Sequence, residues 1–233
     1  WMGEILFRTK LSENLFKGLS PWLSKLPGGL IHVNVVGCAL FAAISGSSAA
    51  TVATVGKMSI PELRKRKYPE KLLLGSLAGS GTLGLLIPPS IILIIYGVTI
   101  EDSIAKLFMA GIIPGIMIAI LFMSYVVIWS IFNKKLMPKT IQNFSFSQKI
   151  KGSRQLLPVI LLIVSVIGSI YTGIATATEA ASLGVVGALT LSWFQKTLNK
   201  NTFKLSLLGA TKTSCMIAFI LAGSTFLSLA MGF

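Results

Sequence analysis

The apolar residues of this chain gather in long runs that are separated by short, mostly basic stretches. The runs at 72–98 and 104–132 exceed the about 20 apolar residues that a helix needs to cross a bilayer, and further runs occupy 156–233. Residues 1–29 instead carry leucines at helical spacing, which predicts an amphipathic helix region on the cytoplasmic side. The pattern therefore predicts an all-α, polytopic membrane protein.

The run at 30–56 is apolar but has small polar residues at its centre. A single crossing there would place the basic stretch 57–71 outside the cytoplasm, against the usual bias of lysine and arginine. A turn in the middle keeps both flanks on one side, and each arm is then too short to span. We predict a re-entrant helical hairpin, although small residues also occur where helices pack closely together. The turn would consist of Ser45, Gly46, Ser47 and Ser48.

The run at 72–98 contains glycines, hydroxyls and two adjacent prolines. Each backbone group freed inside hydrocarbon costs several kcal/mol unless protein or water satisfies it, so a passive anchor gains nothing from such breaks. Broken helices commonly expose backbone groups to an ion or solute at membrane depth, which favours transport. A proline kink in a packed helix is the alternative interpretation. The residues of the break are Gly81, Thr82, Gly84, Pro88, Pro89 and Ser90.

Composition and charge support a membrane protein. Of the 233 residues 53% are hydrophobic and only 12% charged, whereas soluble domains carry about a quarter charged residues. The net charge of +14 does not indicate a nucleic-acid partner, because the basic residues fall in clusters between apolar runs. These clusters, including 57–71 and 133–155, are typical of cytoplasmic loops.

The hairpin turn and the helix break together predict a binding site built from uncharged oxygens. Hard cations take oxygen ligands, and divalent ions usually require carboxylates, so Na⁺ fits best. We expect no other cofactor, because His32 is the only histidine and the two cysteines lie in separate apolar runs. Helix N-termini at such breaks also favour an anionic solute. The predicted sodium site comprises Ser45, Gly46, Ser47, Gly81 and Thr82.

Two polar positions elsewhere have structural explanations. Glu179 is expected at a helix start with Thr176 or Thr178 as its cap, since burial inside the membrane costs about 2.5–3.5 kcal/mol. Asn34 is expected to hydrogen-bond between the hairpin arms rather than to bind a ligand.

These motifs, in this order, resemble the large membrane subunit of tripartite ATP-independent periplasmic (TRAP) transporters of the ion-transporter superfamily. Ala177 stands where the family usually has proline, which loosens the corner at Glu179. The similar stretches are 27–30, 33–35, 44–51, 60–61, 81–90, 103–104, 107–108, 110–115 and 173–181.

The resemblance implies two inverted repeats, each with a hairpin and a broken helix. Residues 30–132 would be the first-repeat transport elements, 133–155 a cytoplasmic loop, and 156–233 the start of a second, truncated repeat. It further implies a sodium-driven elevator in the bacterial inner membrane that imports an organic acid, such as a C4-dicarboxylate. A periplasmic solute-binding protein and a small membrane subunit would be partners. Both chain ends are expected to be cut from a longer protein.

Other functions remain open at this point. A carrier of the same superfamily that needs no binding protein is the nearest alternative. An intramembrane serine protease requires a general base near its serine, for which His32 is the sole candidate. A non-transporting fragment is a third alternative.

Overall fold

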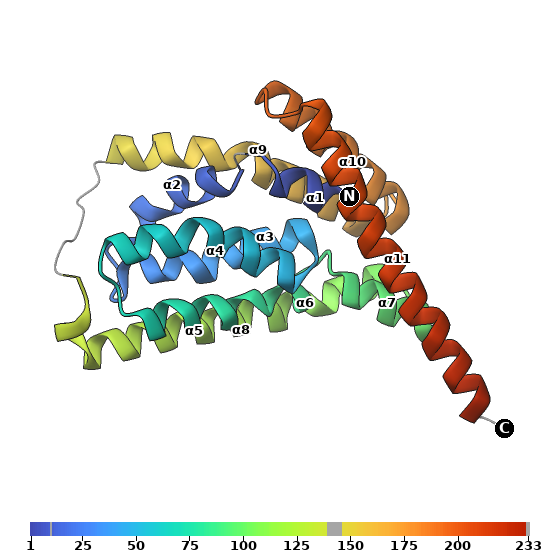
Figure 1. Ribbon diagram of the computed structural model, residues 1–233, viewed down its shortest axis with the longest axis horizontal. Coiled ribbons are helices and arrows are strands. Elements are labelled where there is room, and N and C mark those ends of the chain that lie inside the picture. Colours follow the sequence, from blue (N-terminus) through green and yellow to red (C-terminus); the bar gives the residue numbers. More distant parts are fainter. Residues whose placement is uncertain (10, 139–145, 232–233) are drawn as a thin grey trace.

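Every regular element in the described part of the chain, residues 1–9, 11–138 and 146–231, is helical in the computed structural model (Figure 1). Two short 3₁₀ turns, η1 (Gly29–Ile31) and η2 (Lys134–Leu136), join longer helices. The α-helices are α1 (Met2–Phe7), α2 (Leu11–Leu23), α3 (His32–Ser45), α4 (Ser48–Lys65), α5 (Glu70–Gly81), α6 (Leu83–Leu86), α7 (Ile91–Thr99), α8 (Ile104–Phe132), α9 (Phe146–Tyr171), α10 (Ala177–Phe194) and α11 (Lys200–Met231).

Helix α3 lies at the centre of the first half of the chain. It contacts α2, α4, α5, α6 and α8, and α2 in turn packs against α9 (Figure 1). Most of its side chains are buried, among them Val33, Val35 and Phe41. A helix that is apolar around its whole circumference is expected in the interior of a bundle. The sequence of α3 thus explains its central position.

The chain reverses direction between α3 and α4, which lie side by side (Figure 1). With 14 residues, α3 is about 21 Å long, less than the roughly 30 Å thickness of the hydrocarbon core. Residues 30–56 therefore do not form one continuous rod. The helical hairpin of the predicted fold is confirmed.

Among the described residues, four segments are long and apolar enough to cross a membrane: Glu70–Thr99, α8, α10 and α11. The first of them combines α5, α6 and α7 and is interrupted twice, so the predicted broken helix is confirmed as well. The apolar part of α9, Leu156–Tyr171, is shorter than these four. The polytopic all-α prediction therefore holds.

Two segments that the sequence assigns to loops are partly helical. Helix α4 continues to Lys65, so most of the expected loop 57–71 is regular structure. The reason is amphipathicity, because Leu63 is buried while Lys57 and Arg64 point outward. Likewise, α9 begins at Phe146, inside the expected loop 133–155. Basic residues such as Lys57, Arg64 and Arg154 thus lie on helices rather than in irregular loops.

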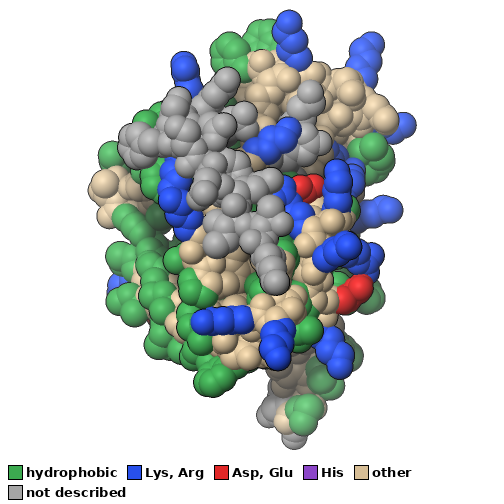
Figure 2. Space-filling view, turned by 90° about the vertical axis from the view of Figure 1, so that its left-hand side faces the viewer, with side chains coloured by type: hydrophobic (Ala, Val, Ile, Leu, Met, Phe, Trp, Pro, Cys, Tyr) green, Lys and Arg blue, Asp and Glu red, His purple; other side chains and the backbone are tan. Residues whose placement is uncertain are grey.

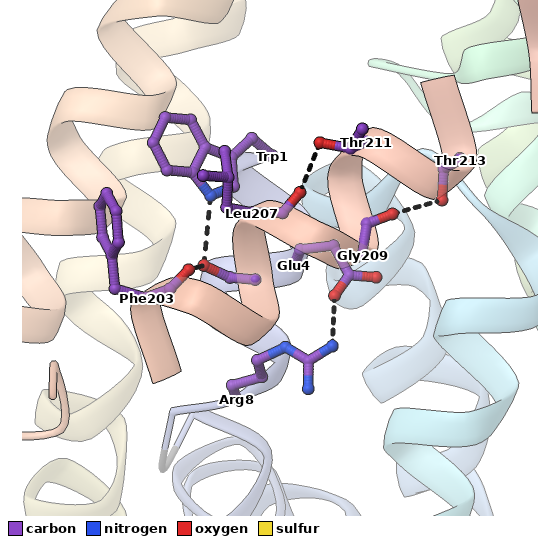
Figure 3. A network of polar contacts seen from close by, with 9 residues as sticks. Trp1, Glu4, Arg8, Phe203, Leu207, Gly209, Thr211 and Thr213 are labelled. Carbon is purple, nitrogen blue, oxygen red and sulfur yellow. Dashed lines mark hydrogen bonds and ion pairs between the residues drawn. The ribbon is translucent and has the colours of Figure 1, made fainter. Parts of the chain in front are cut away.

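Helix α1 connects the hairpin to the second half of the chain. The indole Nε1 of Trp1 donates to Ser206 Oγ on α11 at 3.2 Å, and Glu4 forms a 2.9 Å ion pair with Arg8 (Figure 3). A β-carbon on Gly3 would approach the Cα of Ser45, at the end of α3, to 2.8 Å. Contacts from α1 therefore reach both α3 and α11.

Helix α10 begins with a capping box. The Thr176 hydroxyl accepts from the Glu179 amide at 3.3 Å, and Glu179 Oε2 accepts from the Thr176 amide at 2.8 Å. Two donors of the first turn are thereby satisfied without a partner from elsewhere. Glu179 is exposed at the helix start, and Thr176 rather than Thr178 provides the cap.

Replacing the cap should loosen the first turn of α10. The substitution Thr176→Ala is expected to lower the stability of this turn by about 1 kcal/mol, because it removes the hydroxyl that accepts from the Glu179 amide and donates to Glu179 Oε2. Amide hydrogen exchange at Glu179 should then become about fivefold faster in lipid nanodiscs. Thr178→Ala removes a hydroxyl two residues further along the same turn and serves as the control. Equal acceleration in both variants would contradict the assignment of the cap.

Candidate functional site

The turn of the hairpin is ordered by its own hydroxyl groups. Ser45 Oγ accepts from the Ser47 amide at 3.3 Å and lies 3.0 Å from Thr51 Oγ1. Ser47 is the N-cap of α4, with its side chain accepting from the Ala50 amide at 3.4 Å. Thr51 Oγ1 donates to the Ser47 carbonyl at 2.7 Å. The turn thus presents a small cluster of hydroxyl and carbonyl oxygens.

The hairpin turn touches the helix break directly. The Ile91 amide, at the start of α7, donates to the Gly46 carbonyl at 3.1 Å. Gly46 has a left-handed conformation with φ of 61°, and a β-carbon there would lie 2.8 Å from the Pro89 carbonyl oxygen. Only glycine fits both the dihedral angle and this close approach. The sequence-predicted hairpin turn and break therefore meet in space.

A second close contact with the hairpin turn comes from α6, the segment that precedes α7. A β-carbon on Gly84, in α6, would lie 2.9 Å from the Ser47 carbonyl carbon and 2.9 Å from the Ser48 nitrogen. One on Gly81 would collide with the side chain of Val52. The broken helix therefore packs closely on α4, backbone against backbone at Gly84 and backbone against the Val52 side chain at Gly81.

The break itself is an extended stretch between α6 and α7. Ile87 and Ser90 have extended dihedral angles, and the buried Ser90 hydroxyl donates to the Leu85 carbonyl at 2.7 Å. On the other side, α8 supports the break, since a β-carbon on Gly111 would lie 2.6 Å from the Leu86 carbonyl oxygen and 3.7 Å from Pro88 Cγ. The break is thus enclosed between α4 and α8.

Thr82 is placed differently from its neighbours. It is exposed, and its hydroxyl donates to the Gly79 carbonyl at 2.7 Å, within its own helix segment. The close contacts described for the hairpin turn come from Gly81 and Gly84 instead. A ligand role for Thr82 stays a prediction that requires its hydroxyl to turn away from Gly79.

Asn34 bonds to a helix outside the hairpin. Its Nδ2 donates to Ser76 Oγ at 3.0 Å and to the Leu73 carbonyl at 3.3 Å, both on α5. The expected bond between the two hairpin arms is therefore wrong. Asn34 attaches the buried α3 to the first part of the broken helix.

Thr51 also belongs to the oxygen cluster, although it is not among the residues predicted from the sequence. Thr51 is fully buried and contacts both Ser45 and Ser47. Its position four residues after Ser47 on a helix was the available signal, because residues with this spacing share a face. Glu179, in contrast, has its described hydrogen bonds with Thr176 and belongs to the α10 corner.

Helix termini determine the electrostatics of this site. The N-termini of α4 and α7 lie next to each other at the Gly46–Ile91 hydrogen bond, where α3 also ends. Amide ends carry partial positive charge and carbonyl ends partial negative charge. Residues 45–51 and 81–91 contain no ionisable side chain, and the described residues hold no cluster of metal-binding side chains. The site is polar but formally neutral.

These features define a polytopic helical membrane protein in which a hairpin turn meets the interruption of a spanning helix. The whole chain, residues 1–233, matches the family described as the Tripartite ATP-independent periplasmic transporter, DctM component. The protein belongs to this family, and is thus a component of a transporter rather than an enzyme. His32 agrees with this conclusion, since its Nε2 lies 2.7 Å from the Pro27 carbonyl, at the opposite end of α3 from the serine turn.

Curated relatives carry the same family name. The chain is 37% identical to the C4-dicarboxylate TRAP transporter large permease protein DctM of Pseudomonas aeruginosa, over 95% of this chain and 52% of that protein. It is 36% identical to the DctM protein of Rhodobacter capsulatus, over 98% and 55% respectively. Identity to the sialic acid TRAP transporter large permease protein SiaM of Vibrio cholerae is 32%, over 96% and 52%. The chain thus spans about half the length of these relatives.

The contact between Gly84 and the hairpin turn gives a direct test of the packing. Gly84→Ala is expected to destabilise the complete protein by about 1–3 kcal/mol, because backbone atoms of α4 must shift to admit the new methyl group. Gly75→Ala is the matched control, since a β-carbon there has nothing within 4 Å and helical alanine is favoured over glycine. Thermal unfolding in detergent measures both. A tolerated Gly84→Ala would refute the close packing of turn and break.

Proposed function

We propose that this protein is the permease subunit of a sodium-coupled transporter that imports an organic acid. The observation that carries the proposal is the meeting of the hairpin turn and the helix break through the Ile91–Gly46 hydrogen bond. Such a junction brings the ends of α3, α4 and α7 to one place. Broken helices in transporters use such ends to bind solutes and coupling ions.

Sodium is the coupling ion that suits these oxygens. The carbonyl and hydroxyl oxygens of Ser45, Ser47 and Gly46 carry no formal charge, and neither do those of the break at Gly81 and Thr82. A divalent cation without carboxylate ligands is poorly compensated, whereas a monovalent hard cation needs less negative charge. We place Na⁺ between the turn and the first part of the break.

The same junction favours an anionic solute. The N-termini of α4 and α7 converge on one side of the turn, and amide ends attract carboxylates. Relatives named for C4-dicarboxylate and sialic acid transport support a carboxylate as the transported group. The substrate would contact Ser48, Gly84, Pro88, Pro89 or Ser90 on the turn and the break.

An elevator movement is proposed for the translocation step. The hairpin and the broken helix share a buried interface around α3, so they are suited to move as one body. The proposed setting is the bacterial inner membrane, with a periplasmic solute-binding protein delivering the acid and a small membrane subunit supporting the permease. The family description names a tripartite periplasmic transporter, which supports this assembly.

Removal of the oxygen ligands should weaken sodium coupling. In the complete protein with its partners, Ser47→Ala combined with Thr82→Ala is expected to raise the Na⁺ concentration for half-maximal uptake roughly tenfold, since each lost neutral contact contributes about 0.5–1.5 kcal/mol. Uptake of labelled succinate or sialic acid into proteoliposomes measures this shift.

The control removes two hydroxyls that lie elsewhere on spanning helices. Thr99 and Thr190 each donate only to the carbonyl four residues earlier, at 2.8 Å, so Thr99→Ala with Thr190→Ala should leave the sodium dependence unchanged. The proposal would be refuted if uptake by the unmodified transporter did not depend on a Na⁺ gradient.

A carrier that works without a binding protein is the second candidate. The junction of turn and break alone contains helix carbonyl ends for a cation and helix amide ends for an anion. Uptake should be measured with and without the purified solute-binding protein on the outer side of the vesicles. We expect negligible uptake without it. Substantial sodium-dependent uptake in its absence would favour the second candidate.

A further inference from the structure

Two adjoining cavities lie at the opposite end of the hairpin from the serine turn. They have volumes of about 380 and 400 Å³ and share Ser24, Tyr68 and Pro138 in their walls. The remaining walls come from the loop before α3, the α4–α5 connection and the C-terminal end of α8. Figure 2 shows this end of the molecule, where many Lys and Arg side chains lie on the surface.

The walls of these cavities have an excess of positive charge. Lys25, Lys65, Arg66 and Lys134 line them together with one acidic residue, Glu62. Glu62 is already paired with Arg66, whose Nη2 lies 2.7 Å from its Oε1. In the part of the chain that the structure describes, no ion pair neutralises the three lysines.

Uncommitted hydroxyl groups add hydrogen-bond donors. Ser130 is only 4% exposed, lines the second cavity, and its Oγ has no hydrogen-bond partner among the described residues. The buried Oγ of Ser24, which lines both cavities, likewise has no hydrogen-bond partner among the described residues. The Tyr68 hydroxyl accepts from the Leu30 amide at 3.1 Å, which leaves its proton free to donate. A buried hydroxyl without a partner is costly unless a ligand or water satisfies it.

We propose that these cavities bind a phosphate group, either the headgroup of an anionic lipid or free phosphate. A phosphate offers several acceptor oxygens and full negative charge, which matches three unpaired lysines and three hydroxyls. The cavities lie at the lysine-rich end of the spanning helices, where basic pockets between helices bind anionic headgroups. The site is separate from the junction of turn and break.

Phosphate bound in the two adjoining cavities would connect three elements of the fold. Lys25 follows α2, Lys65 ends α4, and Ser130 and Lys134 belong to the end of α8 and the η2 turn. Lys65 lines the first cavity, whereas Lys25, Ser130 and Lys134 line the second. Phosphate bound in these adjoining cavities should hold the open end of the hairpin against α8. Ligand binding of this kind raises the unfolding temperature with ligand concentration, because only the folded protein contains the assembled site.

The test uses the complete permease in detergent, titrated with dihexanoyl phosphatidylglycerol, dihexanoyl phosphatidylcholine or inorganic phosphate. Native mass spectrometry counts bound lipid, and thermal unfolding gives apparent dissociation constants. The cavity variant combines Lys25→Gln with Lys134→Gln, and is expected to bind the anionic ligand about tenfold more weakly or worse. Ser130→Ala should weaken binding severalfold without lowering the stability of the free protein.

The control variant combines Lys57→Gln with Lys71→Gln, which removes equal charge from exposed positions outside the cavity walls. If the protein prefers phosphatidylglycerol and only the cavity variants lose this preference, the proposal is supported and the bound phosphate belongs to a lipid headgroup. The same pattern with inorganic phosphate supports it with free phosphate. Equal losses in cavity and control variants would overturn it, because binding would then follow the overall positive charge. Absence of anion binding to the unmodified protein would overturn it too.

Discussion

The structure depends on one constraint, namely that backbone groups freed inside a membrane protein must find partners within the protein. The chain frees such groups twice, at the hairpin turn and at the break, and places the two openings against each other. The Ile91–Gly46 hydrogen bond satisfies a donor from one and an acceptor from the other. Close backbone approach requires residues without side chains, which explains Gly46 and Gly84, and Gly81 leaves the space that the Val52 side chain fills. Without this contact, the Gly46 carbonyl and the Ile91 amide would each lose a hydrogen-bond partner.

This arrangement produces a polar site without ionised side chains. An intramembrane carboxylate is costly to bury and must be paired or protonated, whereas helix ends carry their partial charges at no additional desolvation cost. Positive amide ends and negative carbonyl ends occur within a few residues of each other at the turn. A cation and an anion can therefore occupy neighbouring positions and offset each other's charge. Neutral sites of this kind suit coupled transport of an ion and an organic acid.

Local sequence signals allowed prediction of both interruptions, because a Ser-Gly-Ser-Ser turn and adjacent prolines act on the backbone where they stand. The extent of α4 escaped prediction, since its basic residues lie on an exposed face of a helix that buries Leu63. The bond from Asn34 to α5 and the inclusion of Thr51 in the oxygen cluster depend on packing between distant segments. The same is true of the two cavities at the open end of the hairpin, whose walls come from three separate parts of the chain. Such contacts have no local pattern in a single sequence.

The position of α1 constrains any movement of the hairpin. Gly3 lies against Ser45 at the hairpin turn, whereas Trp1 is bonded to Ser206 of α11 (Figure 3). The absence of side-chain atoms at Gly209 lets the Glu4 carboxylate lie directly on α11, where it remains paired with Arg8. A six-residue helix thus touches both the turn and the second half of the chain. Displacement of the hairpin relative to α11 must therefore either carry α1 with it or break one of these two sets of contacts.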